Sequence, residues 1–125
     1  MPVYGRAYLY FKKGFDNMEN NENVQATTLE EKIKIIENLD EITLANTVGL
    51  MNSDDYKARF IAEWMQLKIR YNNLRKMLIK LEAGTLEFKP KCSNIVLMNQ
   101  KNFMEQYMKQ LEVRAEIEGI TLPNI

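Results

Sequence analysis

A group of basic and aromatic residues on one predicted helix has the chemistry to bind a nucleotide. Arg70, Tyr71 and Arg75 occur in the stretch IRYNNLRK, and Lys68 lies just before it. Guanidinium groups pair with phosphate oxygens, and an aromatic ring offers a face on which a base can stack. The more ordinary interpretation is a packed tyrosine beside a solvated basic face. The candidate ligand or partner-binding residues on this helix are therefore Lys68, Arg70, Tyr71 and Arg75.

The composition argues against the common catalytic and metal sites. None of the 125 residues is a histidine, which removes His-based triads, His-containing zinc sites and histidine acid–base pairs. Cys92 is the single cysteine, so the chain cannot form an internal disulfide and suits a reducing compartment. Without a histidine base, we expect Cys92 to be a half-buried structural thiol. We therefore expect a non-enzymatic protein with no metal site and no cofactor.

Charge and hydropathy restrict the partners. Basic and acidic residues number 17 each, so the formal net charge is zero at pH 7. Balanced charge predicts no general attraction to nucleic acid or to an anionic membrane surface. No apolar run approaches the roughly 20 residues of a transmembrane helix, and the first residues lack the apolar core of a secretory signal. We expect a cytoplasmic protein without direct nucleic-acid or membrane binding.

The candidate residues belong to a long amphipathic helix, predicted over 53–83, around which the chain is organised. Ser53 is placed to cap its first turn, and Gly84 follows its last residue, where glycine commonly ends a helix. Large apolar residues recur at alternating intervals of four and three, the spacing of a coiled-coil seam. Such a seam requires a neighbouring helix, a second copy of the chain, or both. The seam residues are Phe60, Trp64, Leu67, Tyr71, Leu74, Leu78 and Leu81.

A second long helix is predicted over 94–118, after a short connection. Ser93 can cap its first turn, and Gly119 follows its last residue. Pro90 prevents the connection from continuing as helix. Two long helices joined by a short loop form an antiparallel hairpin. We therefore expect a helical hairpin domain over 53–125.

Shorter elements precede this hairpin, within 27–52. Thr28 and Glu31 have the T-x-x-E form of a capping box, which predicts that a short helix begins there. A second short helix can follow over 41–51. The expected fold class is all-α: a long antiparallel helical hairpin preceded by short helices and an aromatic N-terminal arm.

The arm and a polar linker make up 1–26. Residues 3–11, VYGRAYLYF, have the composition of a short β-strand, and an extended arm fits them as well. A single strand is not stable in water, so we expect the arm to pair with another copy of the chain, with residues 86–88 or with a partner, or else to remain mobile. Its candidate binding residues are Tyr4, Arg6 and Tyr8.

Four stretches of the two long helices and their connection are distinctive. They are SDDYKARF at 53–60, LKIRY at 67–71, KLEAGTLEFKPKC at 80–92 and LEVRAEIEGITL at 111–122. These stretches resemble a family of small phage and prophage proteins that is named by relation to a crAss-like phage gene product. Ser93 stands where members of that family often have a proline directly after the loop cysteine.

The resemblance implies a phage or prophage accessory protein in the bacterial cytoplasm, and such proteins frequently disable host defences by binding. Our leading hypothesis is a homo-oligomeric inhibitor whose hairpin or arm binds a host defence protein. A second hypothesis is an oligomeric sponge that sequesters a nucleotide second messenger of the immune response through Arg70, Arg75, Tyr71 or the arm residues Tyr4 and Arg6. A third is a structural or packaging-associated phage protein.

Overall fold

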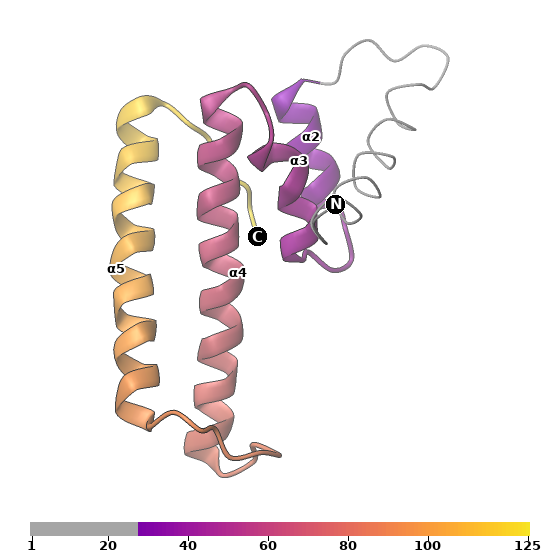
Figure 1. The fold of residues 1–125 in the computed structure, drawn as a ribbon. Coiled ribbons are helices and arrows are strands. Elements are labelled where there is room, and N and C mark those ends of the chain that lie inside the picture. Colours follow the sequence, from indigo (N-terminus) through magenta and orange to yellow (C-terminus); the bar gives the residue numbers. More distant parts are fainter. Residues whose placement is uncertain (1–27) are drawn as a thin grey trace, which may run out of the picture. The chain divides into compact units, whose positions relative to one another are not determined.

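A computed structural model describes residues 28–125, which contain helices and no strands (Figure 1). The all-α class predicted from the sequence is therefore confirmed over this part of the chain. The arm and its residues Tyr4, Arg6 and Tyr8 lie outside the described residues. The helices follow one another as α2 (Leu29–Glu37), the 3₁₀ helix η1 (Leu44–Thr47), α3 (Val48–Met51), α4 (Tyr56–Ala83) and α5 (Asn94–Glu118).

The chain divides into two compact units, and the boundary falls inside α4 after Met65. One unit holds α2, η1, α3 and the first part of α4, together with Leu122–Ile125. The other is Gln66–Thr121, which contains the rest of α4 and all of α5. Among the helices of residues 28–125, none combines the length and the hydropathy that a bilayer crossing requires.

The first unit begins with the capping box that the sequence predicts. The Glu31 backbone N–H donates to Thr28 Oγ1, and the Thr28 backbone N–H donates to Glu31 Oε2, both at 3.2 Å. At the far end of the chain, the Asn124 backbone N–H donates to Glu37 Oε1 at 3.1 Å. Apolar side chains form the core of this unit: Ile36, Leu50, Ala58, Phe60, Ile61, Ala62, Trp64 and Met65 are buried.

Helix α4 begins at Tyr56, three residues after the predicted Ser53. The Ser53 hydroxyl accepts from the Asp55 backbone N–H at 3.1 Å, and Asp55 Oδ1 accepts from the Lys57 backbone N–H at 3.0 Å. Asp55 thus caps the second helical N–H, as an N-cap carboxylate does. The prediction that Ser53 is the N-cap is therefore wrong, because a better-placed carboxylate follows it.

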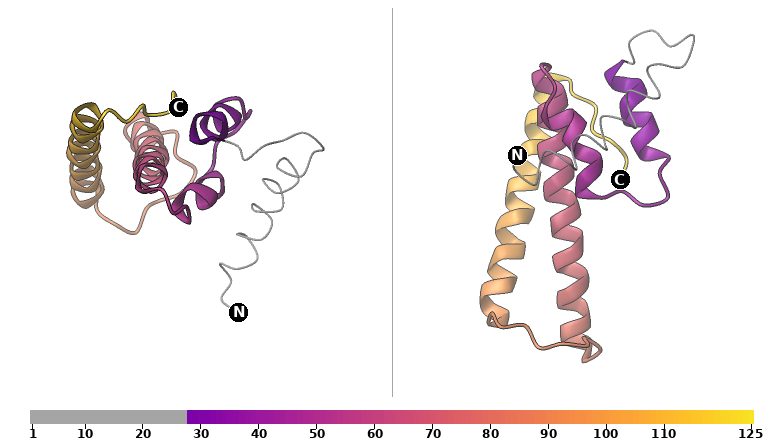
Figure 2. Two further views of the ribbon diagram at one scale, coloured as in Figure 1. Left: turned by 90° about the horizontal axis from the view of Figure 1, so that it is seen from above. Right: turned by 45° about the vertical axis from the view of Figure 1, so that its right-hand side comes forward.

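The second unit is a helical hairpin. Figures 1 and 2 show α5 beside the part of α4 that starts at Gln66, running in the opposite direction. Ser93 Oγ accepts from the Val96 backbone N–H at 3.4 Å, and Gly119 ends α5 with a left-handed φ of 68°. Gly84 ends α4 with a φ of 76°. The three predicted end signals after position 83, namely Gly84, Ser93 and Gly119, are therefore present in the structure.

The seam of α4 is not covered evenly. Phe60 and Trp64, in the first unit, are buried, with exposed fractions of 4% and 5%. The later seam residues are half-buried: Leu67, Tyr71, Leu74, Leu78 and Leu81. Helix α5 adds a row of exposed apolar side chains, including Phe103 and Ile117. The hairpin therefore leaves apolar surface in contact with solvent when the chain is alone.

Candidate functional site

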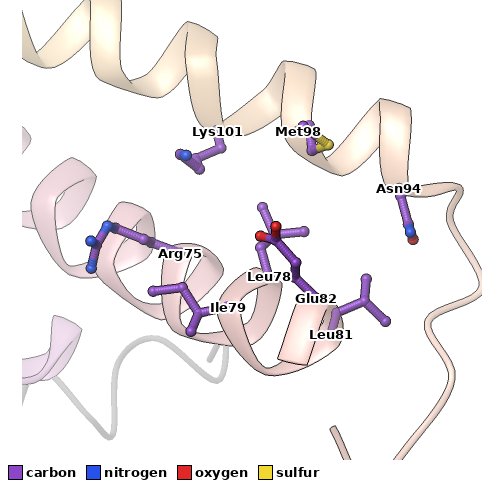
Figure 3. A pocket seen from close by; sticks show the side chains of 8 residues that line it. All are labelled: Arg75, Leu78, Ile79, Leu81, Glu82, Asn94, Met98 and Lys101. Atoms are coloured by element: carbon purple, nitrogen blue, oxygen red, sulfur yellow. The ribbon is translucent and has the colours of Figure 1, made fainter. Parts of the chain in front are cut away.

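A pocket of about 380 Å³ lies between α4 and α5 within the second unit, near their connection (Figure 3). This volume is at the lower end of the range of small-molecule pockets, which starts near 300 Å³. The pocket combines apolar side chains with two cations, one carboxylate and one amide. Its lining residues are Arg75, Leu78, Ile79, Leu81, Glu82, Asn94, Met98 and Lys101.

Helical periodicity brings these residues together. On α4, Glu82 follows Arg75 by seven residues and therefore lies on the same face two turns later. On α5, Asn94, Met98 and Lys101 share one face in the same way. Figure 3 shows the three side chains of α5 extending toward α4, with the Glu82 carboxylate facing α5. The pocket is thus built from two facing helical rows.

The opposite directions of the two helices give the pocket two chemically different ends. Arg75 precedes Glu82 on α4, whereas Lys101 follows Asn94 on α5. In an antiparallel pair this order places the two cations at the end away from the connection. The Asn94 amide lies at the end near the connection, and the Glu82 carboxylate lies between the ends, next to Leu78 (Figure 3). The pocket therefore has two cations at one end, an amide at the other, and apolar side chains with one carboxylate between them.

The polar groups of the pocket are open to a ligand. Within residues 28–125, the side chains of Glu82, Asn94 and Lys101 make no hydrogen bond or ion pair with the protein. Lys101 is half-buried, while Arg75 and Glu82 are exposed. A half-buried cation interacts with an anion more strongly than a fully solvated one, because less water screens it. Lys101 is thus the better-shielded of the two cations.

A hydrogen bond between α4 and α5 lies next to the cationic end of the pocket. Tyr71 lies one helical turn before Arg75, and Glu105 lies one turn after Lys101. The Tyr71 hydroxyl donates to Glu105 Oε1 at 2.8 Å. This hydrogen bond, together with burial and the Glu105 charge, raises the pKa of Tyr71 above 10.0, and Arg75 opposes the rise. The bond joins the two helices directly beside the two cations.

Of the four candidate binding residues that the sequence predicts on α4, one lines the pocket. Arg75 lines it, whereas Tyr71 is engaged with Glu105 one turn away. Arg70 is exposed and does not line the pocket, because five residues on a helix rotate a side chain by about 140° from Arg75. Lys68 is half-buried and also lies outside the lining. The seam residues Leu78 and Leu81 belong to the pocket wall.

Three polar residues of the pocket are not predicted by the sequence. Glu82, Asn94 and Lys101 carry no motif that marks them as binding residues. The one available signal was spacing, because Arg75 and Glu82 are separated by seven residues, as are Asn94 and Lys101. This spacing predicts a shared site only when the alignment of the two helices is known.

Two further features concern other kinds of site. In the part of the chain that the structure describes, no group of three or more Asp, Glu or Cys side chains could hold a metal ion. Cys92 is exposed, so the prediction of a half-buried thiol is wrong. The connection that carries Cys92 has few apolar anchors, and Phe88 within it is itself exposed.

Comparison with known proteins gives one match. A family model described as Sequestin matches residues 54–117, more than half of the chain. Neither a curated protein nor a solved structure matches the chain significantly. The match falls inside the region of the resemblance noted from the sequence, and it carries no link to a crAss-like phage. It covers almost all of α4 and α5, including every residue of the pocket. The chain therefore belongs to the Sequestin family.

Proposed function

We propose that this Sequestin-family chain is a non-enzymatic sponge that binds and sequesters a nucleotide second messenger. The observation that carries the proposal is the pocket with Arg75 and Lys101 at one end and apolar side chains beside them. The family name supports it, since it suggests sequestration of a ligand. The setting that we propose is the bacterial cytoplasm, where removal of such a messenger counteracts an immune response.

The pocket suits a nucleotide because its cationic end and its apolar side chains match the two chemically different parts of one, the phosphate and the base. A guanidinium and an ammonium group bind phosphate oxygens through charge-assisted hydrogen bonds. Leu78 and Met98 offer an apolar surface for the flat face of a base, and methionine adapts well to such contacts. With a volume of about 380 Å³, the pocket is at the small end for a ligand site, so we assign it one nucleotide unit.

The sequestering function has more support than the other hypotheses. A blocker of a host defence protein that uses the arm would depend on Tyr4, Arg6 and Tyr8, which are outside the described residues. A structural or packaging-associated role gains no support from the pocket or from the family name. Of the three hypotheses drawn from the sequence, the sponge is the one that both observations favour.

We further propose that the sponge is a homo-oligomer. The half-buried seam residues of the second unit and the exposed apolar side chains of α5 leave surface that a second copy could cover. Phe103 is 68% exposed and Ile117 is 78% exposed. Burial of such side chains contributes about 1.5–3 kcal/mol each when it is complete, which is a substantial driving force for association.

Isothermal titration calorimetry with cyclic mononucleotides and cyclic dinucleotides tests the sequestering function. We expect at least one of them to bind, and Arg75→Ala or Lys101→Ala to weaken it by about tenfold or more, because a hydrogen bond to a charged group contributes about 1.5–3 kcal/mol. Arg70→Ala is the matched control, since this exposed arginine of the same helix does not line the pocket. Equal losses from Arg70→Ala and Arg75→Ala would contradict the proposed site.

Native mass spectrometry of protein purified from a bacterial lysate gives an independent readout. A trapped nucleotide appears as extra mass on the intact assembly and disappears when the subunits are denatured. Failure of every cyclic nucleotide to bind in calorimetry, with no such adduct, would contradict the sequestering function.

A further inference from the structure

A carboxylate beside the cationic end of the pocket is bound by a tyrosine and not by a cation. Glu105 follows Lys101 by four residues on α5, a spacing at which the two side chains are neighbours on the helix surface and commonly form an ion pair. Within residues 28–125, however, no ion pair joins Glu105 to Lys101 or to Arg75. Glu105 Oε1 instead accepts from the Tyr71 hydroxyl at 2.8 Å. The hydroxyl thus holds a carboxylate that has two cations within reach.

Arg75 is near the same hydrogen bond from the other helix. It follows Tyr71 by four residues on α4, so the two side chains lie on one face of that helix. The pKa of Tyr71 reflects both neighbouring charges, since Glu105 raises it and Arg75 lowers it. Tyr71 and Arg75 on α4, with Lys101 and Glu105 on α5, therefore form one polar group at this end of the pocket.

A released Glu105 carboxylate would compete with a phosphate group for the two cations. Carboxylates and phosphates both accept charge-assisted hydrogen bonds from ammonium and guanidinium groups. Lys109 is the other cation that a released Glu105 could reach, because it follows Glu105 by four residues on the side away from Lys101. Glu82, the carboxylate that lines the pocket, belongs to α4 and makes no contact with the Tyr71 hydroxyl. Its charge is therefore a constant background to any change at Glu105.

We propose that Tyr71 is a positioning residue of the pocket, whose hydroxyl holds the Glu105 carboxylate away from Lys101 and Arg75 and so keeps both cations free for the phosphate of the ligand. The inference rests on the proposed sequestering function and adds a residue that controls the charge of the site from outside its lining. The competing explanation is that the hydrogen bond only aligns the two helices. The two explanations differ in whether the negative charge of Glu105 matters.

The test is calorimetric titration of the full chain with cyclic AMP, cyclic GMP, cyclic di-AMP and cyclic di-GMP, after which the tightest of these ligands is titrated into the variants. Tyr71→Phe keeps the ring and removes the hydroxyl, and we expect it to weaken binding by about threefold, the effect of an exposed ion pair. Glu105→Gln removes the charge but keeps an oxygen that can accept from Tyr71, so it should bind the ligand at least as tightly as the unmodified chain. In the Glu105→Gln background, Tyr71→Phe should cause no further loss.

Glu112→Gln is the control, because it removes the same charge from an exposed position of α5 outside the pocket and should not change the affinity. An equal loss from Tyr71→Phe with and without Glu105→Gln would overturn the inference, since the hydrogen bond would then act only by aligning the helices. Unchanged binding by Tyr71→Phe would also overturn it, because the released carboxylate would then pair with Lys109 or with water. Both results would leave the sequestering function intact. Absence of binding by all four ligands and by the other cyclic nucleotides would overturn the sequestering function itself, and this inference with it.

Discussion

Tyr71 of α4 donates a 2.8 Å hydrogen bond to Glu105 of α5, across 34 residues of sequence. This hydrogen bond joins one turn of α4 to the facing turn of α5. One turn from it, on either helix, lie Arg75 and Lys101. Slippage of one helix by a turn would move it about 5.4 Å along its axis and would separate the two cations. This interhelical hydrogen bond and the apolar packing therefore both favour the alignment that forms the pocket.

Tyr71→Phe should destabilise the chain slightly while keeping the ring in place. The loss should be about 0.5 kcal/mol in the free energy of unfolding, at the low end for a hydrogen bond, because Glu105 is exposed. Urea denaturation followed by circular dichroism measures it. Tyr56→Phe is the control, because Tyr56 is an exposed tyrosine near the start of α4. If both substitutions cost the same, the hydrogen bond contributes nothing to stability.

The Tyr71 hydroxyl should also make stability depend on pH in the alkaline range. Its pKa is raised in the folded chain, first by the hydrogen bond to Glu105, then by burial and by the Glu105 charge. The folded state therefore holds the phenolic proton more tightly than the unfolded state, whose pKa is about 10. The stabilisation is complete below that value and is lost as the pH rises through the higher folded pKa.

The measurement is the difference in unfolding free energy between the unmodified chain and Tyr71→Phe, from about pH 8 to about pH 11. This difference isolates Tyr71 from the other tyrosines, which titrate in both proteins. We expect the advantage of the unmodified chain to shrink toward the alkaline end. A difference that grows with pH would show that the phenolate is favoured in the folded chain, contrary to the hydrogen bond with Glu105.

Gly119→Ala should destabilise the end of α5 by about 1 kcal/mol, because an L-residue pays for a left-handed φ. Gly119 has a φ of 68°, and the Ile120 backbone N–H donates to the Ala115 carbonyl at 2.9 Å just beyond it. A Cβ at Gly119 would meet no atom within 4 Å, so the loss would come from the backbone alone. Thermal denaturation measures it.

Gly119→Asn separates this cause from a change in packing. Asparagine adopts the left-handed conformation more readily than alanine, so its loss should be smaller despite its larger side chain. A larger loss for asparagine than for alanine would mean that side-chain volume, not backbone conformation, decides the stability at this position.

The helices could be predicted from the sequence because their signals are local. Thr28 and Glu31 form both bonds of the predicted capping box, and α5 has the predicted bounds of 94–118. The predicted start of α4 is wrong because two possible N-cap residues lie close together, and Asp55 rather than Ser53 caps the helix. Serine and aspartate are both good N-cap residues, and the sequence alone does not show which of two such residues, two positions apart, caps the helix.

The pocket could not be predicted to the same extent, because it depends on the alignment of two helices. The basic side chain of Arg75 makes it a candidate, but the sequence offers only its near neighbours Lys68, Arg70 and Tyr71 as partners. Lys101 lies 26 residues further along the chain and reaches the pocket through the hairpin. Arg70 is close to Arg75 in the sequence, but helical rotation places the two side chains on different sides of α4.

Phe103→Glu and Ile117→Glu should each reduce the size of the proposed homo-oligomer. Both residues are highly exposed apolar side chains of α5, and a charge within an apolar interface is costly. Sedimentation velocity should show a smaller species for each variant than for the unmodified chain at equal concentration. Asn102→Glu adds the same charge at an exposed polar position of this helix and should leave the size unchanged. An unmodified chain that sediments as a monomer would contradict the homo-oligomer directly.

Glu37→Ala should release the C-terminal tail from α2 without unfolding the first unit. The Asn124 backbone N–H donates to Glu37 Oε1 at 3.1 Å, so this amide loses its partner when the carboxylate is removed. A net hydrogen bond of about 0.5–1.5 kcal/mol corresponds to roughly two- to tenfold faster exchange of the Asn124 amide with deuterium. The amides of α2 should exchange as before, because Glu37 is exposed and caps no turn of its own helix.

Glu37→Gln is the matched variant, since its amide oxygen can still accept from Asn124 and should retain most of the protection. Faster exchange throughout α2 would instead indicate that Glu37 stabilises the helix itself, and unchanged exchange at Asn124 would show that the tail is held by the buried Pro123 and Ile120 rather than by this bond.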